Sequence, residues 1–211
     1  MINIGIIGSG SMGSALGKIW ARQGHQVMFS YSRDRQKLEA LAASAGSNAQ
    51  TGTPAEAAQF GEVILFVVPW GAVKDALEAA GSLEGKIVIS CVNPLKADMS
   101  GLEIGTSTSG AEEIAKLAPR AKIVEVLFPF AEILHSDSRQ FDSQVATQFY
   151  CGDDADAKAT VAKLITDVGL QPVDAGSLTN ARYLEPVGML LVQLAYVGGM
   201  GANIGLKLLQ R

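Results

Sequence analysis

The feature that most constrains this chain is a glycine-rich turn between a short apolar run and an amphipathic stretch. Residues 2–7 have the composition of a buried strand, and Gly8-Ser9-Gly10-Ser11-Met12-Gly13 follows them directly. The first glycine allows a tight turn, the second lets the backbone approach a pyrophosphate, and the third permits close packing of helix on strand. Apolar residues then recur at helical spacing and place Trp20 in the core. The pattern predicts a dinucleotide-binding βαβ unit.

Short apolar runs alternate with amphipathic stretches along the rest of the chain, which is typical of repeated βαβ units. Strands are expected at residues 2–7, 26–30, 62–68, 86–91, 122–127, 147–151 and 171–173. Helix starts are marked by hydroxyl caps at Thr53 and Ser109 and by the acidic pair Asp153-Asp154. The predicted fold is an α/β, Rossmann-type, doubly wound, mostly parallel sheet. Residues 1–176 form the cofactor-binding domain, and residues 177–211 form a C-terminal helical segment that packs on it.

The composition excludes several classes of protein. Apolar residues make up 48% of the chain and charged residues 18%, so extensive disorder is disfavoured. A net charge of -4 without any block of Lys or Arg predicts neither a nucleic-acid partner nor an anionic membrane partner. Cys91 and Cys151 lie apart in apolar runs, which favours neither a disulfide framework nor a metal site and fits a reducing cytoplasm.

One uncharged segment, residues 186–206, has about the length needed to cross a bilayer. Pro186, Gln193, Asn203 and five glycines interrupt it, and no basic cluster or aromatic belt flanks it. An apolar helix can also be buried within a protein. We therefore expect this segment to be a helix buried in the core or at a dimer interface, not a membrane span.

The end of the second predicted strand selects the dinucleotide. An acidic residue at this place normally binds the adenosine ribose, but here the chain reads Ser30-Tyr31-Ser32-Arg33-Asp34 and continues to Lys37. Arg33 can stack on adenine or bind a ribose phosphate, and Lys37 adds a charge one turn later. These residues predict NADP instead of NAD. The alternative is a solvated helix start at which Asp34 compensates the helix dipole.

Further candidates follow later strands at the same edge of the sheet, where ligands bind in open α/β folds. Trp70 is expected either to contact the cofactor or to cap the core, and Asn93 either to contact the nicotinamide ribose or to form an Asx turn. The candidate cofactor-binding residues are Gly8, Ser9, Gly10, Ser11, Met12, Gly13, Ser32, Arg33, Lys37, Val68, Pro69, Trp70, Lys74, Asn93 and Ala131.

These segments resemble the family of NADPH-dependent reductases of the deazaflavin coenzyme F420. The resemblance also covers residues 151–154, 174–176 and 180–185, in the same order and spacing. It implies a homodimer that binds NADP at the carboxyl edge of the sheet and stacks a deazaflavin over the nicotinamide. Hydride would then pass directly between the two rings. Alignment of the rings is the main contribution expected of the protein, so no catalytic side chain and no metal is predicted.

The chain departs from that family after the strand at residues 122–127, where relatives carry a histidine or an Asn-Thr pair. Residues 127–131 read Leu-Phe-Pro-Phe-Ala and form an apolar, aromatic wall suited to a planar ring such as F420 or a flavin-like molecule. His135 is interpreted as a surface or helix residue, and His25 as structural.

Three alternative functions stay open: a reductase of imines or hydroxy acids, a reductase of ferric or flavin acceptors, and a non-catalytic NADPH-binding sensor. Reductases of imines or hydroxy acids need a further helical substrate domain. Only about 35 residues follow the last predicted strand, too few for such a domain.

Overall fold

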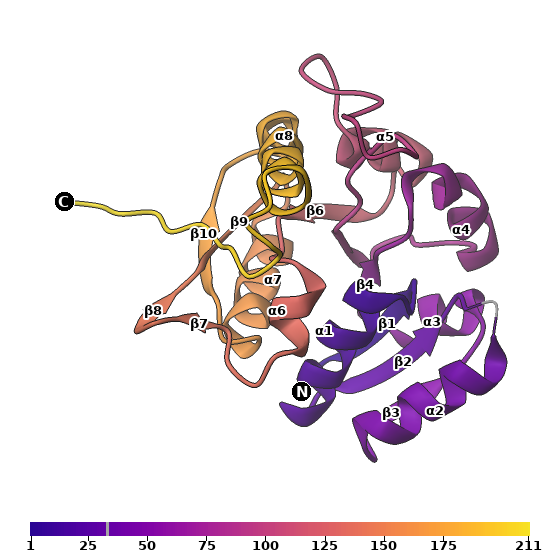
Figure 1. Cartoon of the computed structure of the whole chain (residues 1–211). Helices are drawn as coiled ribbons and strands as arrows, with labels where there is room; N and C mark the ends of the chain where they lie inside the picture. Colours follow the sequence, from indigo (N-terminus) through magenta and orange to yellow (C-terminus); the bar gives the residue numbers. More distant parts are fainter. Residues whose placement is uncertain (33) are drawn as a thin grey trace.

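The glycine-rich turn joins the first strand to the first helix of a doubly wound sheet. The computed structural model describes residues 1–32 and 34–211. Within these residues eight strands form one sheet in the order β10-β9-β6-β5-β4-β1-β2-β3, with helices on both faces (Figure 1). Neighbouring strands of this sheet are parallel except β6 and β9, which are antiparallel. This architecture confirms the predicted Rossmann-type, mostly parallel sheet.

The observed strands agree closely with the predicted ones, apart from a few very short strands that were not predicted. Those of the large sheet are β1 (Asn3–Ile7), β2 (Gln26–Ser30), β3 (Ala49–Thr51), β4 (Val63–Phe66), β5 (Ile87–Ser90), β6 (Lys122–Val126), β9 (Thr147–Gly152) and β10 (Gln171–Asp174). The edge strand β3 and the small hairpin of β7 (Gln140–Phe141) and β8 (Gln144–Val145) were not predicted. Their two or three residues are too few to carry an apolar pattern.

Two groups of helices bury the two faces of the sheet. One face is covered by α1 (Ser11–Arg22), α2 (Arg35–Ala45), α6 (Ala131–His135) and α7 (Ala155–Asp167). The other is covered by α3 (Pro54–Phe60), α4 (Val73–Ala80), α5 (Gly110–Leu117) and α8 (Ala181–Val192). Trp20 is fully buried, as predicted, and its indole N–H donates to the Leu164 carbonyl at 3.0 Å, which links α1 to α7.

The predicted helix starts are confirmed in detail. Thr53 and Glu56 form a reciprocal capping box at α3, and the Ser109 hydroxyl accepts the Glu112 N–H at the start of α5. Asp154 caps α7 by accepting the Ala157 N–H at 2.8 Å. Each cap satisfies a backbone donor that a helix end leaves without an intrahelical partner.

The C-terminal segment is helical only in part. After α8 comes a π-helical turn, Gln193–Val197, and the rest of the chain is extended. It passes beside β9, where the Thr147 N–H donates to the Leu206 carbonyl at 2.8 Å, and only its last residues lead away from the body of the molecule (Figure 1). The prediction of a helical segment over residues 177–211 is therefore wrong beyond Val197. Gly199 and Gly201 adopt φ values of 72° and 76°, which end a helix. No helix formed by the described residues is long and apolar enough to cross a membrane.

Candidate functional site

The three glycines of the turn meet different surroundings. A Cβ at Gly8 would lie 2.2 Å from the Val67 carbonyl oxygen, and one at Gly13 would lie 1.9 Å from the Gly8 carbonyl oxygen. Gly8 also has a φ of 113°, which disfavours any side chain. A Cβ at Gly10, by contrast, would meet no atom within 4 Å. Packing and backbone conformation therefore require Gly8 and Gly13 to be glycine, whereas the space above Gly10 is free for a ligand.

Hydrogen bonds fix this turn against the neighbouring strand. The Ser9 hydroxyl donates to the Ser30 carbonyl at 2.7 Å, and the buried Ser30 hydroxyl donates to the Ile6 carbonyl at the same distance. Gly10 occupies the N-cap position of α1 and supplies no side-chain cap. The first N–H groups of α1, together with the positive end of its dipole, are thus suited to phosphate oxygens. The turn fits a dinucleotide pyrophosphate.

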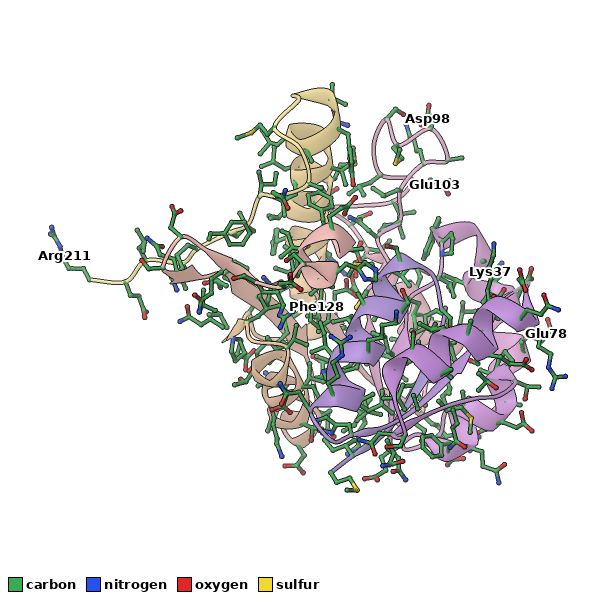
Figure 2. All side chains as sticks on the ribbon, turned by 60° about the horizontal axis from the view of Figure 1, so that its bottom comes forward. Lys37, Glu78, Asp98, Glu103, Phe128 and Arg211 are labelled. Carbon is green, nitrogen blue, oxygen red and sulfur yellow. The ribbon has the colours of Figure 1, made fainter. Side chains whose placement is uncertain are left out.

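The loop after β2 presents a cation at the surface. Tyr31, with a φ of 58°, turns the chain away from the strand, and the exposed Ser32 follows. Asp34 caps α2 by accepting the Lys37 N–H at 3.1 Å, as the alternative interpretation of this segment expected. The Lys37 side chain is 84% exposed, and its Nζ lies 3.9 Å from Asp34 Oδ2 (Figure 2). Arg33, the other predicted phosphate ligand, lies outside the described residues.

A pocket of about 380 Å³ opens at the carboxyl edge of the sheet, beside the start of α1. It brings together the predicted residues Ser11, Met12, Asn93 and Ala131. One wall is the apolar stretch of residues 127–131, which includes the buried Phe128 (Figure 2). Residues of α8 and its π-helical turn complete the lining. The aromatic wall predicted from the sequence therefore lines the same cavity as the start of the first helix.

The four predicted residues that follow β4, numbered 68–70 and 74, do not line this pocket. Val68 is buried and Pro69 is exposed. Trp70 is half-buried and packs against the core on the α4 side of the sheet, the position that its structural interpretation expected. Lys74 lines a separate hollow of about 480 Å³ between the ends of α4 and α5. That hollow lies before the amino ends of β5 and β6, away from the edge where ligands bind in this fold. A cofactor role for these four residues stays a prediction.

Two buried carboxyl groups also line the pocket, and the sequence analysis did not identify them. Glu125 on β6 and Glu185 on α8 are only 4% and 2% exposed. Both Glu185 oxygens accept backbone N–H groups at the start of α5, from Gly110 at 2.9 Å and Ala111 at 3.1 Å. Glu125 Oε2 and Asn93 Oδ1 are buried acceptors with no hydrogen-bond donor among the described residues. A glutamate inside the apolar run 122–127 was the signal that could have identified Glu125.

The surroundings of these carboxyl groups favour their neutral forms. Burial and the nearby Glu185 charge raise the pKa of Glu125 well above its usual range, with the Ser90 side chain acting in the opposite direction. Burial raises the pKa of Glu185 to about 7, although its two backbone donors favour the charged form. The pair therefore carries at most one full negative charge near neutral pH.

The surroundings of the cysteines and histidines indicate structural roles for these side chains. Burial raises the pKa of the Cys91 thiol well above its usual range and that of Cys151 to about 12, so neither is a thiolate at neutral pH. The buried His25 lies with its Nε2 3.1 Å from Asp167 Oδ2, which confirms its structural interpretation. His135 is an exposed residue of α6, as predicted, with Nε2 3.1 Å from the Ser11 carbonyl oxygen.

A doubly wound sheet, a glycine turn open at Gly10 and a pocket at the carboxyl edge together define a Rossmann-type fold, the class of fold that binds dinucleotides. Residues 3–94 match the model of the family described as NADP oxidoreductase, coenzyme F420-dependent. This match confirms the resemblance found in the sequence. Over these residues the chain is similar to NADP-dependent oxidoreductases.

Two further proteins are similar to this chain over most or all of its length. A candidate F420-dependent NADP reductase from Arthrobacter sp. FB24 has a structure similar to the whole chain, with a TM-score of 0.88, 25% identity and 100% of each chain covered. The metalloreductase STEAP3 of Rattus norvegicus is 30% identical over 190 residues, which are 90% of this chain. This chain spans only 37% of the length of that relative.

A likeness of fold alone extends to a more distant enzyme. A reductive aminase from Aspergillus terreus, whose structure contains NADPH and ethyl levulinate, has a TM-score of 0.68 and 20% identity. The match covers 94% of this chain and 63% of the aminase.

Proposed function

We propose that this protein transfers hydride between NADPH and a planar ring acceptor, most directly the deazaflavin F420 or a flavin-like molecule. The observation that carries the proposal is a single pocket that joins the start of α1 to an aromatic wall. The family match, described as coenzyme F420-dependent, and the Arthrobacter relative support the deazaflavin. NADPH bound along the carboxyl edge would supply the hydride.

The residues of this chain have separate tasks in the proposal. The open face of Gly10 and the N–H groups of α1 hold the pyrophosphate, and Lys37 and Arg33 bind the ribose phosphate. Phe130 and Tyr196 form an edge-to-face aromatic pair with ring centroids 5.5 Å apart at the pocket. Such a rigid apolar wall orients a flat acceptor and keeps water away from the reacting atoms.

The experiment is to follow NADPH oxidation by absorbance with a panel of F420, free flavins, ferric chelates and cyclic imines. Selective oxidation with F420 or a flavin supports the proposal. Preference for an imine would favour the imine reductase alternative. A protein that binds NADPH but reduces none of the acceptors would be a sensor, and the enzymatic proposal would be wrong.

Reduction of ferric or flavin acceptors is the second candidate, and the specific observation that favours it is the similarity to a metalloreductase over 90% of this chain. The same panel separates it, because a metalloreductase-like activity would appear with the ferric chelate. An imine reductase has only the likeness of fold in its favour.

We also propose that the protein forms a homodimer through the outer face of α8. Three large side chains on this face of α8 and on the π-helical turn that follows it are more than half exposed: Tyr183, Leu190 and Val197. Such a cluster of exposed apolar side chains is unusual on a monomer and typical of an interface. Analytical ultracentrifugation tests this, and a monomer at all concentrations would contradict it.

A further inference from the structure

We infer that Glu125 is the proton donor of the reaction, releasing one proton from its side chain to the acceptor for each hydride transferred. The inference rests on the proposed function, because it requires an acceptor in the pocket of Asn93 and Phe128. It adds an acid to a site in which the family resemblance requires only the alignment of two rings.

The position of Glu125 carries the inference. Its side chain projects from the central strand β6, is 4% exposed, and lines the pocket together with Asn93 and Cys91. Its Oε2 has no hydrogen-bond donor among the described residues. If Glu125 were ionised, the charge on its Oε2 would be buried without a hydrogen-bond donor to compensate the loss of solvation, whereas a protonated carboxyl carries no charge and needs only an acceptor for its proton. The geometry therefore favours a carboxylic acid at the pocket wall.

Glu185 explains why the proton resides on Glu125 and not on its neighbour. The two Glu185 oxygens accept the Gly110 and Ala111 N–H groups, and the positive end of α5 stabilises a negative charge there. Glu185 is thus the member of the pair that ionises first. Its charge then disfavours a second one on Glu125, as in other pairs of adjacent carboxyl groups.

The other titratable groups facing the pair do not neutralise it. Cys91 beyond β5 and Cys151 on β9 are both neutral thiols at neutral pH, since burial raises the pKa of each. Glu112 on α5 is near Glu185, but Arg182 compensates it through two hydrogen bonds of 2.6 and 2.8 Å. No cation among the described residues is an ion-pair partner of Glu125 or Glu185 at 4.0 Å or less.

The chemical balance of the step requires such a proton. Hydride transfer delivers two electrons and one hydrogen nucleus to a ring carbon of a deazaflavin or to a ring nitrogen of a flavin, and leaves a negative charge on another ring nitrogen or oxygen. The Glu125 O–H bond breaks as an N–H or O–H bond forms on the acceptor, which gives the fully reduced, neutral ring. The Glu125 carboxylate regains a proton from water after the product leaves.

A second hydroxyl donor at the same pocket provides a contrast. The Tyr196 hydroxyl donates to Glu132 Oε1 at 3.4 Å, and its side chain is 53% exposed, so it lies at the solvent side of the pocket. Burial raises the pKa of Tyr196, which makes the phenol a weaker acid. Tyr196→Phe is therefore expected to retain the pH dependence that Glu125 confers.

The kinetic test compares Glu125→Gln with the unsubstituted protein in single-turnover hydride transfer from NADPH to F420 and to FMN. General acids contribute about 100- to 10,000-fold, so we expect the rate to fall by roughly 100-fold or more. The unsubstituted rate should decrease only at pH values above the range in which Glu185 ionises, where Glu125 itself loses its proton, and the variant should lack that decrease. Glu103→Gln, which changes an exposed loop glutamate, is the matched control and should behave like the unsubstituted protein (Figure 2).

A spectroscopic test does not depend on activity. Infrared spectra of the unsubstituted protein without acceptor should show a protonated-carboxyl band at pH values just above the Glu185 pKa of about 7, which Glu125→Gln removes and Glu103→Gln retains. NADPH affinity should be the same in all three proteins.

The outcomes are distinguishable. An unsubstituted protein that reduces neither F420 nor FMN would refute the proposed function together with this inference. Reduction by Glu125→Gln at the original rate and with the original pH dependence would overturn only the inference. An infrared spectrum of the unsubstituted protein without a protonated carboxyl would also overturn it, even if the variant did not fold.

Discussion

Substitution of Gly10 by alanine should separate ligand binding from folding at the glycine turn. The residue has φ -73° and ψ -161°, a conformation that alanine adopts, and its Cβ would meet no protein atom within 4 Å. We therefore expect the free energy of unfolding to change by less than about 1 kcal/mol. The new methyl group would occupy the space assigned to the pyrophosphate. A tenfold or larger loss of NADPH affinity, about 1.4 kcal/mol, should result.

Gly13→Ala is the matched control for this prediction. Its Cβ would lie 1.9 Å from the Gly8 carbonyl oxygen, which belongs to the backbone and cannot rotate away. Overpacking of this kind costs about 1–3 kcal/mol, so this variant should be clearly less stable. Fluorescence titration with NADPH and urea unfolding, applied to both variants, give the two quantities. If Gly10→Ala binds NADPH as tightly as the unsubstituted protein, the assignment of the pyrophosphate to this turn is wrong.

Three further predictions concern the phosphate loop and the pocket. Arg33→Ala should raise KM for NADPH more than KM for NADH; equal effects would refute a phosphate role. In Gly188→Ala, the new Cβ would lie 2.7 Å from Asn93 Nδ2, so it should displace that amide and weaken acceptor binding. Alanine also gains about 1 kcal/mol in helix propensity, which offsets the cost of the crowding, so the temperature of thermal unfolding should change little. An unchanged KM for the acceptor would refute a binding role for Asn93. The pKa of Glu185 is 4.5 in the unfolded chain and about 7 in the folded protein, so between these pH values the unfolded state binds fewer protons than the folded state. Stability should therefore fall with rising pH across this range, and a pH series of urea unfolding should show a weaker fall in Glu185→Gln.

The parts of the fold with strong local patterns were predictable from the sequence. Buried parallel strands such as Val63–Phe66 are continuous apolar runs, and the caps at Thr53 and Asp154 are local hydrogen bonds set by a few neighbouring residues. The strand Ala49–Thr51 was missed because its place at the sheet edge depends on pairing with β2 and not on its own composition. Helix beyond Val197 was predicted from the lack of charge alone, and the glycines that follow break it.

The candidate site was predictable at the glycine turn and along the aromatic wall, but not in its acidic part. Glu125 and Glu185 are 60 positions apart, and only the packing of α8 over the sheet brings both to one pocket. The start of α5, which binds Glu185, comes from a third region of the chain. Contacts of this kind depend on tertiary structure, so no local pattern could reveal that the two carboxyl groups form a pair.

The central claim is that hydride passes directly from NADPH to a planar acceptor held in the pocket of Phe128 and Asn93. Its most direct test uses NADPH carrying deuterium at the transferable position, incubated with the protein and F420 in ordinary water. The account predicts reduced F420 that contains one deuterium atom from NADPH, detected by mass spectrometry, and no transfer without the protein. NADPH that stays unoxidised with F420 and every other planar acceptor, or a reduced product without deuterium, would contradict it.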